Sequence, residues 1–246
     1  VFLAHSAAGL NGISDSFHGY VRARPTHVAT ERPVILNTWE AVYFAHDLNT
    51  LSALADRAAA VGVERFVLDD GWFLGRDDDR RALGDWVVDP AKWPAGLDPL
   101  IAHVRGLGME FGLWVEPEMI SPDSELFRAH PDWGLVDPHH DPVRARHQLV
   151  LDLTNPGAFE HIRQSLCSLL DDHDISYLKW DMNRDLVAPT DSTGRAAGQA
   201  QTRAVYRLID EIKRTHPDIE IESCSSGGGR IDLGILTRTD RVWTSD

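Results

Sequence analysis

Short apolar runs that alternate with helical segments are the feature that most constrains how this chain of 246 residues can fold. Each run is nearly continuous in apolar residues, which is typical of strands buried on both faces of a parallel sheet. Strands that alternate with helices along a chain predict such a sheet, with right-handed crossovers between the strands. The six predicted strands include residues 34–36, 66–68, 111–115, 177–178, 219–221 and 242–243.

The segments between the strands carry apolar residues three and four positions apart, as one face of a helix does. Gly62 and Gly108 follow two of these segments at the C′ position, where glycine adopts the left-handed conformation. Asn155-Pro156 precedes a third segment as an N-cap and an N1 proline, and His216-Pro217 ends the fourth. The four predicted helices include residues 48–61, 97–107, 159–166 and 205–212.

Two α/β architectures fit this alternation, an open doubly wound sheet and a closed barrel. The first strand is not followed by Gly-x-Gly-x-x-Gly, which disfavours a dinucleotide-binding sheet. Polar and aromatic residues end nearly every strand, as they do at the carboxyl rim of a barrel. We therefore predict an incomplete (β/α)8 TIM-type barrel of about six βα units over residues 33–246, after an irregular lead-in over residues 1–32. Residues 149–153 are a further extended segment that either pairs or supports a loop.

The residues at the predicted strand ends combine carboxylates with tryptophans, a combination suited to binding sugars. Carboxylates accept hydrogen bonds from adjacent hydroxyls, and the apolar face of a pyranose stacks on an indole ring. Two carboxyls on either side of a glycosidic bond supply the acid, base and nucleophile for its hydrolysis. The strand ends are Asn37–Trp39, Asp69–Trp72, Trp114–Pro117, Lys179–Asp181, Cys224–Arg230 and Trp243–Asp246.

Lys179 and Asp181 stand two positions apart at one of these strand ends. Residues two apart on a strand point to the same face, so the charges of this pair can meet. We expect the pairing to keep Asp181 ionised and hence nucleophilic. Taken alone, Lys-x-Asp also fits an ordinary surface salt bridge.

Asp69 and Asp70 are adjacent at another strand end. Adjacent residues on a strand point to opposite faces, so both can reach one ligand only where the strand gives way to its loop. The pair also fits a metal site or an N-cap for the next helix. Together with Glu116 and Glu118, it would suit a metal-dependent barrel lyase or hydrolase.

Other conspicuous residues have simpler interpretations than a role in catalysis. Gly227–Gly229 resembles a phosphate-cradling turn, but no Gly-Lys-Ser/Thr follows, so we expect a flexible turn. Cys224 has no neighbouring His to activate it, which favours a buried or pocket-lining thiol over a nucleophile. His139-His140 lies in a loop rich in Pro and Asp, where a solvated loop is favoured over a metal site. Trp72 and Trp243 fit barrel packing as well as a binding site.

The composition limits which binding partners and which cellular compartment we expect for the protein. A net charge of -14 disfavours nucleic acid and anionic membrane surfaces as partners. Two cysteines, Cys167 and Cys224, make no disulfide framework, so we expect a reducing, cytoplasmic compartment. No apolar run reaches the roughly 20 residues that a membrane span needs, and the first residues lack the basic and apolar regions of a signal peptide. The absence of an initiator Met indicates a piece of a longer chain.

The chain carries eight motifs in order, Asn37–Ala41, Leu68–Phe73, Gly84–Trp86, Gly112–Met119, Leu149–Thr154, Lys179–Asn183, Cys224–Arg230 and Trp243–Asp246. Together they resemble the catalytic barrel of glycoside hydrolase family 36, the α-galactosidases of bacterial and raffinose-utilising type, over residues 15–246. So many motifs in register make the resemblance specific. Members of that family also carry an N-terminal β-sandwich, the rest of the barrel and a C-terminal β-domain. The resemblance therefore implies that residues 1–32 lead in from a missing sandwich.

The resemblance also implies a role for most of the strand-end residues. Asp181 matches the nucleophile of a retaining mechanism, and Asp246 matches its acid/base. Asp69 and Asp70 match the pair that binds O4 and O6 of galactose, and Trp39 walls the same pocket. The other matched positions line the galactose subsite and are Trp114, Arg146, Lys179, Asn183, Cys224 and Gly227. No metal or other cofactor is implied.

The implied function is a retaining α-galactosidase that removes terminal α-linked galactose from oligosaccharides of the raffinose and melibiose type by double displacement. The same barrel serves α-N-acetylgalactosaminidases and the galactosyltransferases that make raffinose or stachyose. Cys224 and Gly227 beside O2 favour the galactosidase. A sugar-binding protein without catalysis is the alternative from another class. The expected partner is a galactoside substrate, and the parent protein is a candidate homo-oligomer.

Overall fold

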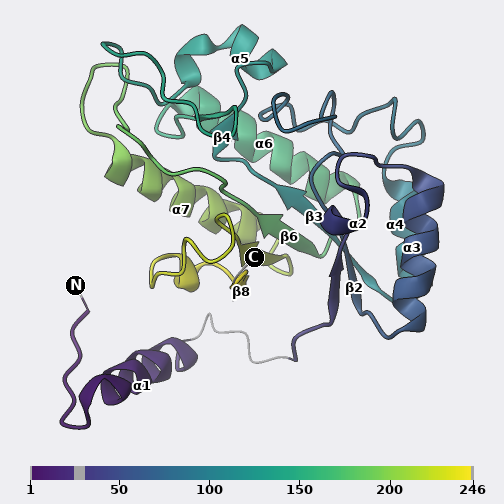
Figure 1. The fold of residues 1–246 in the computed structure, drawn as a ribbon, viewed down its shortest axis with the longest axis horizontal. Coiled ribbons are helices and arrows are strands. Elements are labelled where there is room, and N and C mark those ends of the chain that lie inside the picture. The colour runs from purple at the N-terminus through teal and green to yellow at the C-terminus, as the bar shows by residue number, and fades with distance from the viewer. Residues whose placement is uncertain (1, 25–30, 245–246) are drawn as a thin grey trace.

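A computed structural model describes residues 2–24 and 31–244 of the chain. Six parallel strands form its main sheet and stand side by side in chain order (Figure 1). The sheet curls into a half-barrel, which confirms the predicted incomplete (β/α)8-type barrel. The strands are β1 (Ile35–Asn37), β2 (Arg65–Leu68), β3 (Glu110–Val115), β6 (Tyr177–Trp180), β7 (Glu220–Ser223) and β8 (Arg241–Val242).

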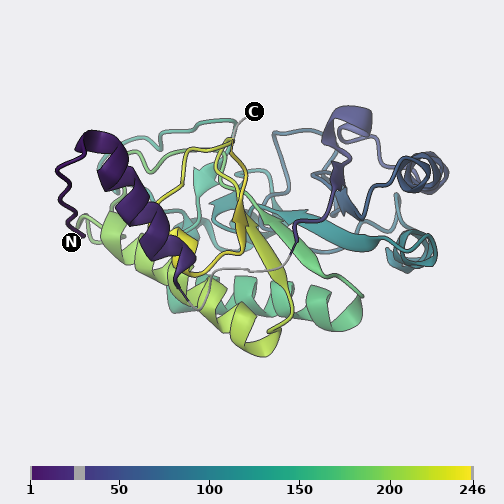
Figure 2. The ribbon, with the colours of Figure 1, turned by 90° about the horizontal axis from the view of Figure 1, so that it is seen from below.

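Four longer helices lie between successive strands of the sheet, where the sequence predicts them. The side chain of Asp47 accepts a hydrogen bond of 2.9 Å from the N–H of Thr50 at the start of the first helix. Asn155 accepts one of 2.8 Å from Gly157 at the start of the third, which confirms the predicted N-cap. Figure 2 shows the two green helices, α6 and α7, along one side of the strands. The four helices are α3 (Leu48–Ala60), α4 (Asp98–Gly106), α6 (Pro156–Asp172) and α7 (Gly198–Thr215).

Shorter elements complete the rim of the sheet. Strand β4 (Met119–Ile120) pairs antiparallel with β5 (Leu149–Val150), so the extended segment predicted at 149–153 does pair, through its first two residues. None of the helices in the described ranges has the length and apolar character that a membrane span requires. The remaining short elements are α2 (Trp39–Val42), α5 (Glu125–Ala129), η1 (Pro131–Trp133) and η2 (Ile235–Thr237).

A helix, α1 (Gly9–Arg22), lies within the lead-in, where the sequence predicted irregular structure. That prediction was wrong for these residues. Leu10, Ile13 and Phe17 recur at helical spacing, but glycines and polar residues between them weaken the pattern. No residue of α1 is buried, and Leu10 is 81% exposed, so the helix makes no part of the barrel core. Figure 1 shows it apart from the sheet.

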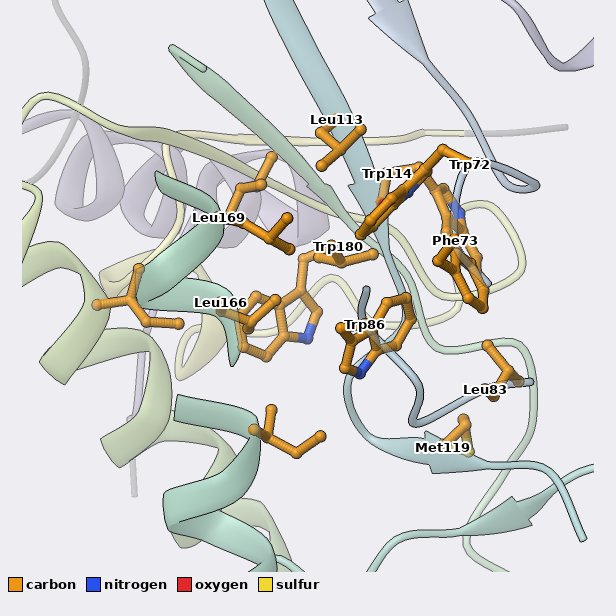
Figure 3. Close-up of a cluster of buried hydrophobic side chains, with 14 of the residues drawn as sticks. Trp72, Phe73, Leu83, Trp86, Leu113, Trp114, Met119, Leu166, Leu169 and Trp180 are labelled. Carbon is orange, nitrogen blue, oxygen red and sulfur yellow. The ribbon is translucent and has the colours of Figure 1, made fainter. Parts of the chain in front are cut away.

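An aromatic cluster fills the space between the carboxyl ends of the strands and the loop after β2 (Figure 3). Trp72 is fully buried, and its Nε1 donates a hydrogen bond of 2.9 Å to the carbonyl of Trp114. Phe73 packs against both Trp86 and Trp114, with ring centroids 4.8 Å and 6.4 Å apart. Trp72 is therefore a packing residue, and the rings of Phe73 and Trp86 pack against Trp114.

The opposite end of the half-barrel is held by charged side chains at the starts of the strands. Arg65 on β2 donates to Glu110 on β3 at 2.5 Å and to Glu220 on β7 at 2.8 Å. Its guanidinium also lies 4.4 Å from the ring centroid of Tyr177 on β6. Arg241 on β8 pairs with Glu220 as well. Since β2 and β7 are not neighbours in the sheet, this network ties strands together across its concave side.

Candidate active site

A cavity of about 670 Å³ opens at the carboxyl ends of the strands. It is lined by all of the predicted site residues that the structure describes, Trp39, Asp69, Asp70, Trp114, Arg146, Lys179, Asp181, Asn183, Cys224 and Gly227. Asp246, the predicted acid/base, lies outside the described residues. Asn37, Glu40, Ser226 and Trp243 also line the cavity. Trp243 therefore belongs to the site and not to the barrel packing alone.

The carboxylate of Asp181 accepts three N–H hydrogen bonds, from Trp114, Met182 and Asn183. Asp181 follows the last residue of β6 and is 6% exposed. Trp114 Nε1 and Asn183 Nδ2 donate to its Oδ2 at 3.1 Å and 2.7 Å, and the N–H of Met182 donates to its Oδ1 at 2.8 Å. An ionised carboxylate is a pure acceptor, so these donors fix its orientation toward the cavity.

Lys179 pairs directly with Asp69, at 3.1 Å, and not with Asp181 as the sequence predicted. Strand β6 ends at Trp180, so the alternation of side chains that places Lys179 and Asp181 on one face stops before Asp181. Burial alone would lower the pKa of Lys179, but nearby charges, Asp69 before Asp181, outweigh it and raise the pKa. The Lys179 ammonium also lies 4.4 Å from the ring centroid of Trp243.

Asp69 and Asp70 both reach the cavity because β2 ends at Leu68 and they already belong to the loop. Asp69 accepts from Asn37 Nδ2, and Asp70 accepts two hydrogen bonds from Arg76, of 2.9 Å and 2.7 Å. Burial raises the pKa of Asp70, and the Arg76 charge opposes that rise. The next helix begins far downstream at Asp98, so Asp69 and Asp70 are not its N-cap.

The loop after β2 is fixed by contacts that the sequence did not reveal. Lys92 Nζ donates to the carbonyls of Gly71 at 2.8 Å and Arg76 at 2.6 Å. Gly71 has a φ of +120°, and a side chain there would approach Phe44 Cα at 3.1 Å and His46 Nε2 at 3.2 Å. In the sequence, Arg76 and Lys92 look like ordinary charged loop residues, and no local pattern singles them out.

His46 lies buried beneath this loop, with 7% of its surface exposed. Neither ring nitrogen has a hydrogen-bond partner in the described parts of the chain. Burial, together with the charge of Lys92, lowers the pKa of His46 to about 4. The neutral ring is therefore the form that the fold accommodates at neutral pH.

Among the acidic residues suggested as metal ligands, three have a cationic partner instead. Asp69 pairs with Lys179 and Asp70 with Arg76, while Glu118 accepts from Arg230 at 2.7 Å. Within residues 2–24 and 31–244, no group of three His, Cys, Asp or Glu side chains could hold a metal ion.

Cys224, Gly228 and the His139-His140 pair are the remaining conspicuous residues. Cys224 is 4% exposed, and burial, with Asp181 nearby, raises the pKa of its thiol, as expected of a pocket-lining thiol. A side chain at Gly228 would meet the Thr244 carbonyl oxygen at 2.5 Å, so close backbone contact requires glycine there. His139 and His140 are exposed in a loop, as predicted.

Comparison with known proteins finds a matching family model and relatives that are named as alpha-galactosidases. The Melibiase family model matches residues 1–246. The alpha-galactosidase of Escherichia coli is 53% identical to the chain, and alpha-galactosidase AgaA of Geobacillus stearothermophilus is 45% identical; each comparison covers 100% of this chain and 35% of the relative. The crystal structure of the GH36 alpha-galactosidase AgaA has a TM-score of 0.91 at 45% identity, over 97% of this chain and 34% of that one. Other structures show AgaA variants in complex with stachyose or raffinose. The chain thus spans about a third of the length of these relatives.

Proposed function

The chain belongs to the Melibiase family, and from this premise we propose that it forms part of the catalytic barrel of an α-galactosidase. The substrates are oligosaccharides that end in α-linked galactose, of the kind that raffinose and stachyose represent in the AgaA complexes. The observation that carries the proposal is the single cavity at the strand ends. It brings together carboxylates, indole rings and amide donors from five of the six strand ends.

The proposed mechanism is a retaining double displacement. Asp181 attacks the anomeric carbon while Asp246 protonates the leaving oxygen, which gives a covalent galactosyl intermediate. Asp246, now deprotonated, then takes a proton from water as the water attacks the same carbon and releases galactose. Asp181 suits the nucleophile because three N–H groups orient it toward the cavity. No Lys or Arg of the described ranges forms a salt bridge with it.

Recognition of galactose is proposed to rest on Asp69 and Asp70, with Trp39 as a wall of the pocket. Each carboxylate is already paired with a cation, which holds it in position while a sugar hydroxyl donates to it. A site that is built to hydrogen-bond a hydroxyl rejects a sugar that lacks it there, because the buried groups are then left unpaired. The axial O4 of galactose is that hydroxyl.

Turnover of two aryl glycosides by the complete gene product tests this proposal. We expect hydrolysis of an aryl α-galactoside and little of the corresponding α-N-acetylgalactosaminide, because Cys224 and Gly227 in the cavity lining match the galactosidase form at the positions beside O2. Transfer of galactose to added sucrose, measured in the same reaction, separates a hydrolase from a galactosyltransferase. Binding of galactose without any turnover would instead indicate a sugar-binding protein, and activity lost to a chelator would favour the metal-dependent alternative.

A further inference from the structure

Glu116 is a buried acid near Asp181 to which the preceding mechanism assigns no role. It follows the last residue of β3 and is 1% exposed. Asp69, Asp70 and Glu118 each have a Lys or Arg partner, whereas no cation of the described segments pairs with Glu116. Its hydrogen bonds come from neutral donors instead. Gln148 Nε2 and the backbone N–H of Asn183 both donate to its Oε1, at 2.9 Å and 2.5 Å.

One of these donors belongs to the segment that orients Asp181. The N–H of Asn183 reaches Glu116, while the side-chain Nδ2 of the same residue donates to Asp181 Oδ2 at 2.7 Å. The side-chain oxygen of Asn183 accepts from Ser226 at 3.3 Å. Displacement of the Asn183 backbone would therefore move a donor away from the proposed nucleophile.

The other donor, Gln148, belongs to the segment that places Arg146 in the cavity lining. Gln148 stands two residues after Arg146 and is 2% exposed. Arg146 and His147 have φ values of +50° and +60°. Residues other than glycine rarely adopt such backbone angles unless the surrounding structure imposes them. Arg184 donates to the carbonyl of Gln148 at 2.8 Å, so Gln148 is held through its backbone as well as its side chain.

We propose that Glu116 is a positioning residue that joins these two segments through one oxygen, and so holds Arg146 at the cavity and Asn183 against Asp181. This inference rests on the proposed α-galactosidase function. A shift of about 1 Å in a supporting group can lower a rate by about a hundredfold, which makes such a link catalytically significant.

Protonation of Glu116 supports this role. Burial, and next the charge of Asp181, raise the pKa of Glu116 to about 8, while the Asn183 and Gln148 donors oppose that rise. The charges near it are those of Asp181, Asp70 and Arg76. A neutral Glu116 still offers the accepting oxygen, and it adds no second negative charge beside the nucleophile.

The acceptor oxygen can be tested separately from the carboxyl group. Glu116→Gln keeps an oxygen in place, whereas Glu116→Ala removes it. In the complete gene product, we expect Glu116→Ala to lower kcat/KM for an aryl α-galactoside about a hundredfold, and Glu116→Gln to recover most of that loss. Glu125→Gln on α5 is the control for the same exchange at an exposed position and should match the unmodified protein.

A second variant removes the donor of the hydrogen bond between Gln148 and Glu116. Gln148→Met keeps the volume of the side chain but removes the donor, and we expect it to raise KM through Arg146 more than it lowers kcat. This variant decides the matter if Glu116→Ala does not fold. The inference is overturned if Glu116→Ala stays within threefold of the unmodified protein, if Glu116→Gln loses as much activity as Glu116→Ala, or if Gln148→Met leaves KM unchanged. An unmodified protein without α-galactosidase activity would refute the proposed function instead.

Discussion

At the scale of single residues, the cavity shows how a few side chains acquire distinct roles from their neighbours. Asp69 and Asp70 are charge-paired, Asp181 is surrounded by neutral N–H donors, and Cys224 is a buried thiol. Among the buried carboxylates that line the cavity, only Asp181 forms no salt bridge with a cation of the described residues. These surroundings make it the candidate nucleophile.

Replacement of Asp181 by Gly should abolish turnover of an aryl α-galactoside by the complete gene product, because no carboxylate remains to attack the anomeric carbon. The space that the side chain leaves should admit azide, which attacks from the same face and gives a galactosyl azide of inverted configuration. Product analysis by NMR checks this outcome. A Gly variant that keeps near-parental activity without azide would remove Asp181 from the mechanism.

At the scale of elements, the loop after β2 contributes both to the proposed sugar site and to the folding stability of the protein. It carries Asp70 to the cavity, it is fixed by Lys92, and it covers the buried ring of His46. An unfolded His titrates near 6.5, whereas burial lowers the pKa of His46 to about 4. The unfolded chain therefore takes up this proton first as the pH falls.

The stability that depends on neutral His46 is complete above pH 6.5 and is lost as the pH falls toward 4. The difference in pKa corresponds to about 3 kcal/mol of unfolding free energy. His46→Leu should remove that part of the acid sensitivity, which denaturant unfolding at pH 7 and pH 4 would measure. His103→Gln, at a more exposed position on α4, is the control for the loss of a histidine. Equal acid sensitivity in His46→Leu and the parent would contradict the assignment.

The elements themselves were largely predictable, because each depends on local signals. The strands follow from short apolar runs, and the start of α6 from Asn155-Pro156. Most cavity residues were found because they occupy strand ends within recognisable motifs. The partner of Lys179 could not be found in this way, since its contact with Asp69 joins positions 110 residues apart. The roles of Arg76 and Gln148 likewise depend on how loops fold back, which no local pattern encodes.

At the scale of the whole molecule, the parallel sheet has two outer edges. Strand β1 pairs only with β2, and β8 only with β7, among the described residues. Each edge presents a row of backbone donors and acceptors that invites pairing with another chain. A half-barrel also lacks the opposite wall that would fill its interior with side chains.

We therefore expect residues 1–246, expressed alone, to aggregate, to associate through these edges, or to show negligible α-galactosidase activity. Asp246 would be the last residue of such a chain, with its own carboxylate as an added like charge. Catalytic groups must be held to within about 0.5 Å, so this end would be poorly positioned. Size-exclusion chromatography with light scattering, and the aryl α-galactoside assay, check the outcome. A monomer as active as the complete gene product would overturn it.

The pairing of Lys179 with Asp69 has a consequence for the order in which the molecule assembles. During synthesis, β1, β2 and β3 emerge long before β6. Asp69 is therefore unpaired in the nascent chain until Lys179 has been synthesised. Closing a loop of 110 residues is entropically costly until strand pairing compensates for it. The end of the sheet that carries the proposed galactose site should consequently be completed late in folding. Pauses in translation before β6 would prolong a state in which the cavity is half built and its aromatic lining is open to chaperones.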